Sequence, residues 1–230
     1  MKRITTVIAT LATPLFLLLP SAVFSHEAGD FILRVGATSV VPDESSGLIS
    51  TATTGALAGT GAGVGNSTQL GLNFVYMWSD NIGIEVLAAT PFEHDLTAKG
   101  LGLHGFATTG LGSTDQLPPT LTFNYFFGGA DSTIRPYLGL GVNYTAFFSE
   151  SLSSQAKTEL GARSLDVDDS VGVAFRAGVD FNIGDRWILN ASLWNIDIDT
   201  DVTFNSALGK VKVSAEIDPW VYMISLGYRF

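Results

Sequence analysis

The chain ends in the stretch WVYMISLGYRF (220–230), whose side chains alternate with a period of two. One set of alternate positions is entirely aromatic or aliphatic: Trp220, Tyr222, Ile224, Leu226, Tyr228 and Phe230. A period of two is that of a β-strand. An apolar stripe with aromatic residues at both ends is typical of a lipid-facing strand in an outer-membrane β-barrel, where aromatic girdles lie at the two interfaces. We therefore interpret 220–230 as the last strand of such a barrel.

The N-terminus indicates export. Lys2 and Arg3 precede a mostly apolar segment that ends at Pro20, and small residues follow shortly before His26. This is the pattern of a secretory signal peptide, which we assign to residues 1–25. The alternative, a transmembrane anchor, fits less well because Pro14 interrupts the apolar run, which is shorter than the roughly 20 residues of a spanning helix.

The composition narrows the classes of partner. The chain has 22 acidic and 12 basic residues, a formal net charge of −10, so nucleic acid is not an expected partner. It has no cysteine, hence no disulfide framework. We expect a single domain over residues 26–230 and no cofactor. The acidic clusters, such as 166–169 and 197–201, are explained most simply as solvated surface, and binding of a divalent cation is the alternative.

Alternating patterns predict eight membrane-crossing strands, and therefore an all-β, eight-stranded antiparallel transmembrane β-barrel. The expected strands cover 30–41, 68–78, 82–92, 116–127, 134–148, 168–182, 187–199 and 211–230. Short turns rich in Gly, Asp and Asn join the second to the third, the fourth to the fifth and the sixth to the seventh strand. The other connections are long, as expected of loops on the outer side. We expect the Gly- and Ala-rich segment 47–65 to be a mobile outer loop.

Several stretches of the chain also match a known family. They are HEAGDFILRVG (26–36), TQLGLNFVYMWSDNIGIEVLAATPFEH (68–94), QLPPTL (116–121), RPYLGLGVNYTAFF (135–148), SLWNIDIDT (192–200) and DPWVYMISLGYRF (218–230). They closely resemble the outer membrane protein W (OmpW) family, and the resemblance departs mainly in the outer loops. It implies an outer-membrane barrel that passes small, mostly hydrophobic molecules, with an assembly signal at Tyr228 and Phe230.

Strand alternation predicts which charged side chains face the barrel interior. They fall in the periplasmic half: Arg34, Glu85, Arg135, Arg176, Asp180 and Arg229. Opposite charges in so narrow a lumen can pair and fill it. We expect Arg34, Glu85, Arg176 and Asp180 to form a plug.

Nearer the outside, the inward positions become apolar. They predict a substrate path lined by Leu87, Phe147, Trp194, Ile196, Ile217 and Met223. The resemblance implies that Trp194 and Leu87 form the floor of this path. Two alternatives are a solid core that merely anchors the barrel and, for Trp194 alone, a place in the interfacial aromatic belt.

A plug would force a hydrophobic substrate to leave sideways, which requires a weak point in the strand ladder. Pro118 and Pro119 offer one, since neither has an N–H to donate. We expect them to mark a lateral exit. A simple corner between loop and strand is the alternative.

No catalytic motif is evident. The sequence has no nucleophile elbow of the GxSxG type, and the Gly-Leu-Gly run at 139–141 belongs to a strand rather than a phosphate loop. A metal site from His94 with Glu93 or Asp95 lacks a recurring ligand spacing, so we expect none. Three classes of function remain: a passive channel for small hydrophobic molecules, a narrow pore for small polar solutes or ions, and a structural or surface-recognition barrel. The expected partners are outer-membrane lipid and a small hydrophobic substrate, with the oligomeric state unknown.

Overall fold

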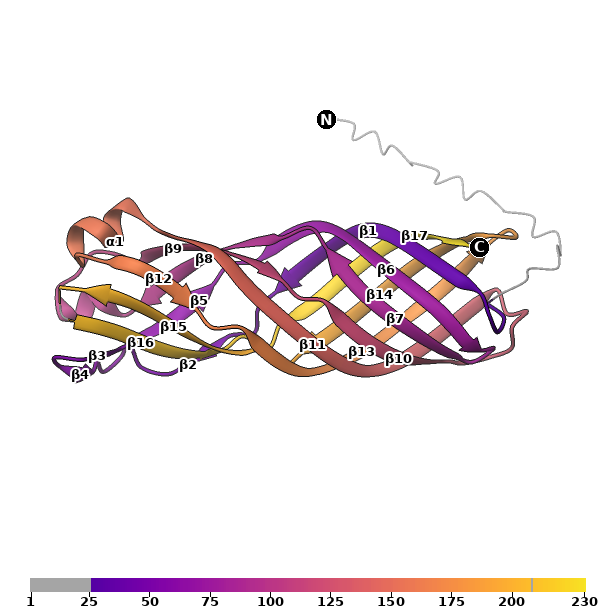
Figure 1. The fold of residues 1–230 in the computed structure, drawn as a ribbon, viewed down its shortest axis with the longest axis horizontal. Coiled ribbons are helices and arrows are strands. Elements are labelled where there is room, and N and C mark those ends of the chain that lie inside the picture. The colour runs from indigo at the N-terminus through magenta and orange to yellow at the C-terminus, as the bar shows by residue number, and fades with distance from the viewer. Residues whose placement is uncertain (1–25, 208) are drawn as a thin grey trace, which may run out of the picture.

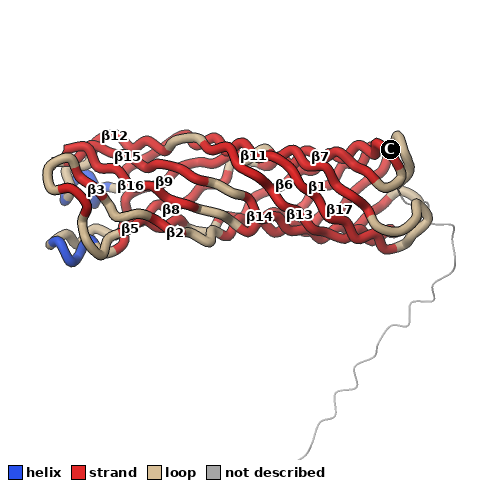
Figure 2. Tube along the Cα trace, turned by 90° about the horizontal axis from the view of Figure 1, so that it is seen from below, coloured by secondary structure: helices blue, strands red, loops and turns tan. Residues whose placement is uncertain are grey.

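The computed structural model describes residues 26–207 and 209–230. The predicted signal peptide, 1–25, lies outside the described residues. The described chain is almost entirely β-structure and forms one elongated tube (Figures 1 and 2). Within these residues, no helix is long and apolar enough to cross a membrane.

Eight strands close the barrel, as the sequence predicts. They are β1 (Phe31–Val41), β6 (Ser67–Ser79), β7 (Ile82–Ala89), β10 (Thr120–Phe126), β11 (Ile134–Leu152), β13 (Ser170–Ile183), β14 (Trp187–Ile196) and β17 (Trp220–Arg229). Neighbours along the chain pair antiparallel, β1 pairs with β17, and the β10–β11 pairing completes the ring. A closed ring leaves no edge of unpaired backbone groups in lipid.

Side chains alternate between lipid and interior along these strands. In β17, Ile224 is 67% exposed whereas its neighbour Met223 is 1% exposed. The aromatic residues near the periplasmic end contact one another on the lipid face. Trp187 stacks edge to face with Tyr228, which does the same with Phe230. The predicted parity of the last strand is therefore confirmed.

The outer connections form a β-structured extension of the barrel wall. In Figures 1 and 2 this extension continues the tube at the end opposite to the C-terminus. Its elements are β2 (Ser45–Ser46), β3 (Ser50–Thr51), β4 (Gly55–Ala56), β5 (Gly61–Val64), β8 (Phe92–Lys99), η1 (Leu101–His104), β9 (Gly110–Leu117), α1 (Ser154–Glu159), β12 (Arg163–Val167), β15 (Asp199–Ser206) and β16 (Gly209–Glu216). The extension has its own apolar core, in which Leu96, Leu111 and Val213 are buried.

Several expectations differ from the structure in detail, and the expected strands 116–127 and 187–199 each run across the boundary between two strands. The segment 47–65, expected to be an outer loop, carries the short strands β3, β4 and β5, and Ile49 is buried in the core of the extension. The stretch 211–230 is two strands, β16 and β17, since the chain bends at Asp218, which has a positive φ of 38°. This bend places β16 in the extension and explains how Lys212 and Glu216 can face outward: they lie above the lipid.

Candidate functional site

Charged side chains gather in the periplasmic half of the barrel interior. Arg34 on β1 donates to Glu85 at 3.0 Å and to Asp180 at 2.5 Å, and all three are fully buried. Arg176 pairs with Glu85 from the opposite wall. The structure thus brings the four predicted plug residues together in one alternating network of charges. Such a network is stable only because each charge has an opposite partner.

Residues outside the predicted set complete the plug. His26, just before β1, places Nε2 2.6 Å from Asp180. Its backbone carbonyl accepts from Arg135 at 2.9 Å. The Tyr137 hydroxyl accepts from Arg176 at 2.7 Å. Arg229, also expected inside, instead lies at the rim, 3.6 Å from Asp30.

An apolar layer lies directly on the plug. Trp194 and Leu87 are 0% and 3% exposed and belong to one buried cluster, in which Phe147 is a half-buried neighbour. The guanidinium of Arg176 lies 4.4 Å from the centroid of the Trp194 ring, so the two layers are in contact. Because Trp194 faces the interior, its assignment to an interfacial belt is wrong. The cluster also contains Val40, Phe92, Ala174, Ile196, Ile198, Ile217, Val221 and Met223.

Above this layer, the extension encloses a narrow apolar cavity. Its volume is about 20 Å³, and Phe147 and Ile217 line it together with Val64, Leu96 and Val202. A single water needs roughly 10–15 Å³, so side chains nearly fill this part of the interior. In this conformation the interior is closed rather than an open pore.

Pro118 and Pro119 separate β9 from β10 and interrupt the wall on one side. The ladder between β7 and β10 ends at the pair Leu87–Thr120, and the ladder between β8 and β9 begins at Phe92–Gln116. On the other side the contact with β11 continues, since Tyr144 donates its N–H to the Pro119 carbonyl at 3.1 Å. We call the interval between these two pairs the seam. Leu87, a member of the buried apolar cluster, lies at its lower edge.

Comparison with known proteins agrees with this architecture. The model of the OmpW family matches residues 27–230. The chain belongs to the OmpW family. Outer membrane protein W of Vibrio cholerae is 45% identical over 208 residues, 90% of this chain and 92% of the relative. The crystal structure of OprG, an outer membrane protein from Pseudomonas aeruginosa, superposes with a TM-score of 0.85 at 43% identity and covers 90% of this chain and 99% of that one. A more distant relative from Pseudomonas aeruginosa, 27% identical over 96% of this chain and 97% of its own length, is named dibenzothiophene metabolism operon protein PahQ.

Membership of the OmpW family places the protein in the outer membrane, as predicted. The relatives are outer-membrane barrel proteins, and such barrels sit in the lipid bilayer. Tyr228 and Phe230, the residues expected to signal assembly, lie at the periplasmic end of the barrel. Phe230 is 69% exposed on the lipid face, and its backbone N–H donates to the Phe31 carbonyl at 2.9 Å.

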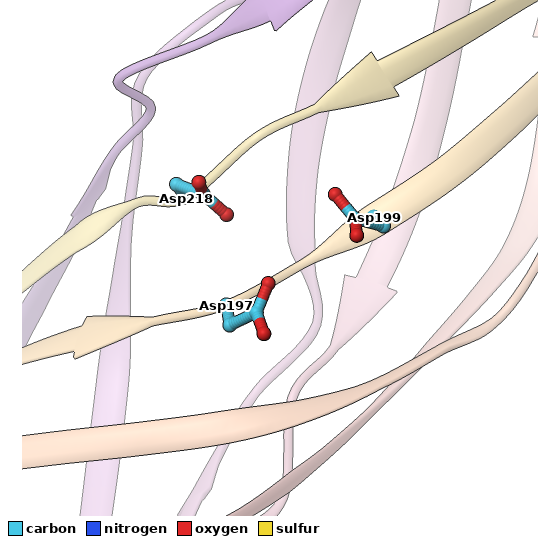
Figure 3. A group of neighbouring side chains, drawn as sticks. All are labelled: Asp197, Asp199 and Asp218. Atoms are coloured by element: carbon cyan, nitrogen blue, oxygen red, sulfur yellow. The ribbon is translucent and has the colours of Figure 1, made fainter.

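Candidate cation ligands lie in two places in the structure. His94 faces the interior of the extension, whereas its neighbours Glu93 and Asp95 face outward. Three other carboxylates, those of Asp197, Asp199 and Asp218, converge where the extension meets the barrel, with oxygens within 4.8 Å of one another (Figure 3). Desolvation and the neighbouring carboxylates raise the pKa of Asp199. This group is surface-exposed, as solvated acidic clusters commonly are.

Proposed function

We propose that the protein is a passive, non-catalytic channel for small, mostly hydrophobic molecules, which leave sideways into the bilayer. One observation carries this proposal: two buried apolar clusters follow one another from the extension down to Trp194, and below them lies a plug in which each charge has an oppositely charged neighbour. An apolar solute is accommodated by such a lining. An ion is not, because it would lose its hydration without gaining partners.

The substrate path is the set of inward side chains Leu87, Phe147, Trp194, Ile196, Ile217 and Met223. All are buried or half-buried. Because the cavity is small at rest, passage requires these side chains to move aside for the solute. Met223 suits this role, since methionine is unbranched and fills irregular space.

The plug of Arg34, Glu85, Arg176 and Asp180 blocks the straight route for an apolar solute. Moving through it would separate buried charges from their partners, which costs about 3–5 kcal/mol for a single pair. The seam at Pro118 and Pro119 offers a shorter way out, because Leu87 lies at both the path and the seam. The name of PahQ supports the same class of substrate, since dibenzothiophene is an apolar aromatic compound.

A structural or surface-recognition barrel is the second candidate function. The close packing of the interior favours it, because a barrel that only anchors binding surfaces needs a filled core. A narrow polar pore is supported less, since the layer above the plug is apolar.

Transport is tested by Leu87→Arg, with uptake of a radiolabelled hydrophobic compound measured in cells at matched barrel levels. The variant introduces a cation that is costly to desolvate into the apolar path. We expect uptake to fall toward that of cells without the protein. Val86→Ala is the matched control, because Val86 is the adjacent residue and faces lipid.

The lateral exit is tested by replacing Pro118 and Pro119 with Thr and Val, which restores two ladder donors. Uptake should slow while the barrel stays folded. Unchanged uptake in this variant and in Leu87→Arg would refute the channel and leave the structural barrel. A change of ion conductance in Leu87→Arg with unchanged hydrophobic uptake would instead identify the polar pore.

A further inference from the structure

The outer end of the extension contains a second apolar cavity, which we call the tip cavity. In Figure 1, α1 and β3, which contribute to its lining, lie at the end of the tube opposite to the C-terminus. The tip cavity has a volume of about 100 Å³, compared with about 20 Å³ for the cavity above the apolar layer. Its walls are built mainly from aliphatic and aromatic side chains: Ile49, Leu57, Leu101, Leu160, Phe204 and Val211.

The tip cavity has a buried floor and an exposed mouth. Ile49, Leu101 and Phe204 are at most 5% exposed and belong to the core of the extension. Glu159 and Ala207, which also line the cavity, are exposed. The N–H of Ala207 donates to the Leu160 carbonyl at 3.1 Å, which joins the end of β15 to the end of α1 at this mouth. The floor is therefore held by the core, while the cavity opens to the outside.

The size and lining of the tip cavity favour an apolar occupant. An apolar cavity of roughly 150 Å³, lined by Leu, Ile and Phe, stays dry and binds benzene or xenon. The hydroxyls on the lining already have partners within the chain: Thr51 Oγ1 lies 2.7 Å from Thr54 Oγ1, and Ser206 Oγ donates to the Gly209 carbonyl at 3.1 Å. Water needs two to four polar partners and finds few here.

The charge at the mouth favours a neutral occupant. Among the described residues that line the tip cavity, Glu159 is the charged one. Its carboxylate accepts from the Thr108 hydroxyl at 2.7 Å and from the Gln155 amide at 3.1 Å. These two hydrogen bonds lower the pKa of Glu159, so it is ionised at neutral pH. An organic anion would meet this negative charge and would also lose hydration on entering an apolar space.

Apolar pairs on β15 and β16 connect the tip cavity to the interior below it. Phe204 pairs with Val211 at the tip cavity, and Val202 pairs with Val213 nearer the membrane. Val202 also lines the smaller cavity, together with Ile217 of the apolar layer. The tip cavity therefore lies at the outer end of the same apolar interior that ends on the plug.

We propose that the tip cavity binds one small, neutral, apolar molecule of about the size of a benzene ring, and that it is the outermost binding site of the substrate path. The binding itself follows from the size, lining and charge of the cavity. Its role in uptake rests on the proposed channel function. The site adds a size limit and a selection against organic acids to that function.

The first experiment measures binding without transport. Methyl NMR of the refolded barrel in lipid nanodiscs follows Ile49, Leu101 and Val211 while benzene or benzoate is added. We expect saturable shifts of these methyl groups with benzene and none with benzoate. Leu138, which is 56% exposed on the lipid face, reports benzene dissolved in the bilayer. Shifts that do not saturate and match those of Leu138, or equal shifts with benzene and benzoate, overturn the proposal.

The second experiment fills the mouth of the cavity with Ala207→Phe. The benzene-induced shifts should be lost, because the new ring occupies the site. Ala58→Phe is the matched control, since Ala58 is exposed at the same end of the extension and is not part of the lining. It should leave the shifts unchanged. Retained shifts in Ala207→Phe would place benzene elsewhere and refute the site.

Uptake of radiolabelled benzene, in cells at matched barrel levels, separates the site from the channel. We expect Ala207→Phe to slow uptake toward that of cells without the protein, and Ala58→Phe to leave it unchanged. Unchanged uptake in Ala207→Phe would refute the role of the tip cavity in the path. If the parent takes up benzene no faster than cells without the protein, the channel function fails, whereas the NMR shifts still decide whether the cavity binds benzene.

Discussion

Arg176 is the residue at which the two halves of the interior meet. Its guanidinium pairs with Glu85, donates to Tyr137 and lies over the ring of Trp194. A cation can do all of this because its charged edge and its flat face make different contacts. The apolar layer therefore lies directly on the charged plug, and the Glu85 carboxylate keeps a cationic partner.

The plug should dominate the stability of the barrel at the level of single residues. Arg34→Met leaves Asp180 without its closest cationic partner in a fully buried place. We expect a loss of about 3–5 kcal/mol in the free energy of unfolding, because an uncompensated charge remains inside. Denaturant unfolding of the refolded barrel measures it. Arg229→Met is the control, since that arginine is partly exposed at the rim, and should cost clearly less. Equal losses in the two variants would contradict a buried plug.

At the level of elements, the last strand has separable roles in closure and in assembly. Its backbone joins β17 to β1, and the N–H of Phe230 takes part whatever the side chain is. The side chain itself points into lipid. Phe230→Ala should therefore lower the amount of protein inserted in the outer membrane but not the activity of each inserted barrel. Membrane levels and uptake per barrel are the measurements, with Leu226→Ala as a control on the same face. Equal insertion of the Phe230 variant and the parent would count against an assembly signal.

The elements that the sequence predicts well are those with a local signal. Barrel strands repeat every two residues between turn-forming residues, so β6, β7 and β13 come out within a few residues of their true bounds. The inward parity of Arg34, Glu85 and Trp194 follows from the same repeat. The short strands of the extension carry no such signal, because they depend on distant partners. Ser46 on β2, for example, pairs with Ala215 on β16.

The same limit applies to the candidate site. His26 and Asp180 are 154 residues apart in the sequence, and no local sequence pattern predicts their contact. His94 and Gln116 were recoverable in principle, because Phe92, His94, Leu96 and Ala98 continue the alternation of the third strand into the extension. What the sequence does not contain is the register that sets β8 against β9. Without it, the contact between the side chains of His94 and Gln116 cannot be predicted.

For the whole molecule, we expect the apolar layer and the plug below it to make the protein a poor conductor of ions. The apolar layer excludes hydrated ions, and the plug fills the lumen below it. We expect near-background conductance in planar bilayers for the parent and for Trp194→Ala. Arg34→Ser with Asp180→Ser, which leaves Glu85 paired with Arg176, should also stay closed.

The triple variant combines Trp194→Ala with Arg34→Ser and Asp180→Ser, and so weakens both the apolar layer and the plug. Only this variant should conduct clearly. Refolded barrels with confirmed β-structure are required for each variant, so that a leak from misfolded protein is recognised. Large conductance in the parent, or in either partial variant, would show that the two layers do not act in series.

Strand β11 is longer than a membrane crossing requires. A crossing needs about 9 to 11 residues, whereas β11 has 19, so its outer part stands beyond the lipid as wall of the extension. β9 pairs with this outer part and β8 pairs with β9, so both strands belong to the extension and not to the membrane-crossing ring. Under the proposed channel function, substitutions in these outer strands would alter uptake selectivity and leave the lipid-facing surface of the membrane-embedded half unchanged. Uptake selectivity and membrane insertion would then evolve separately, because they depend on different parts of the tube.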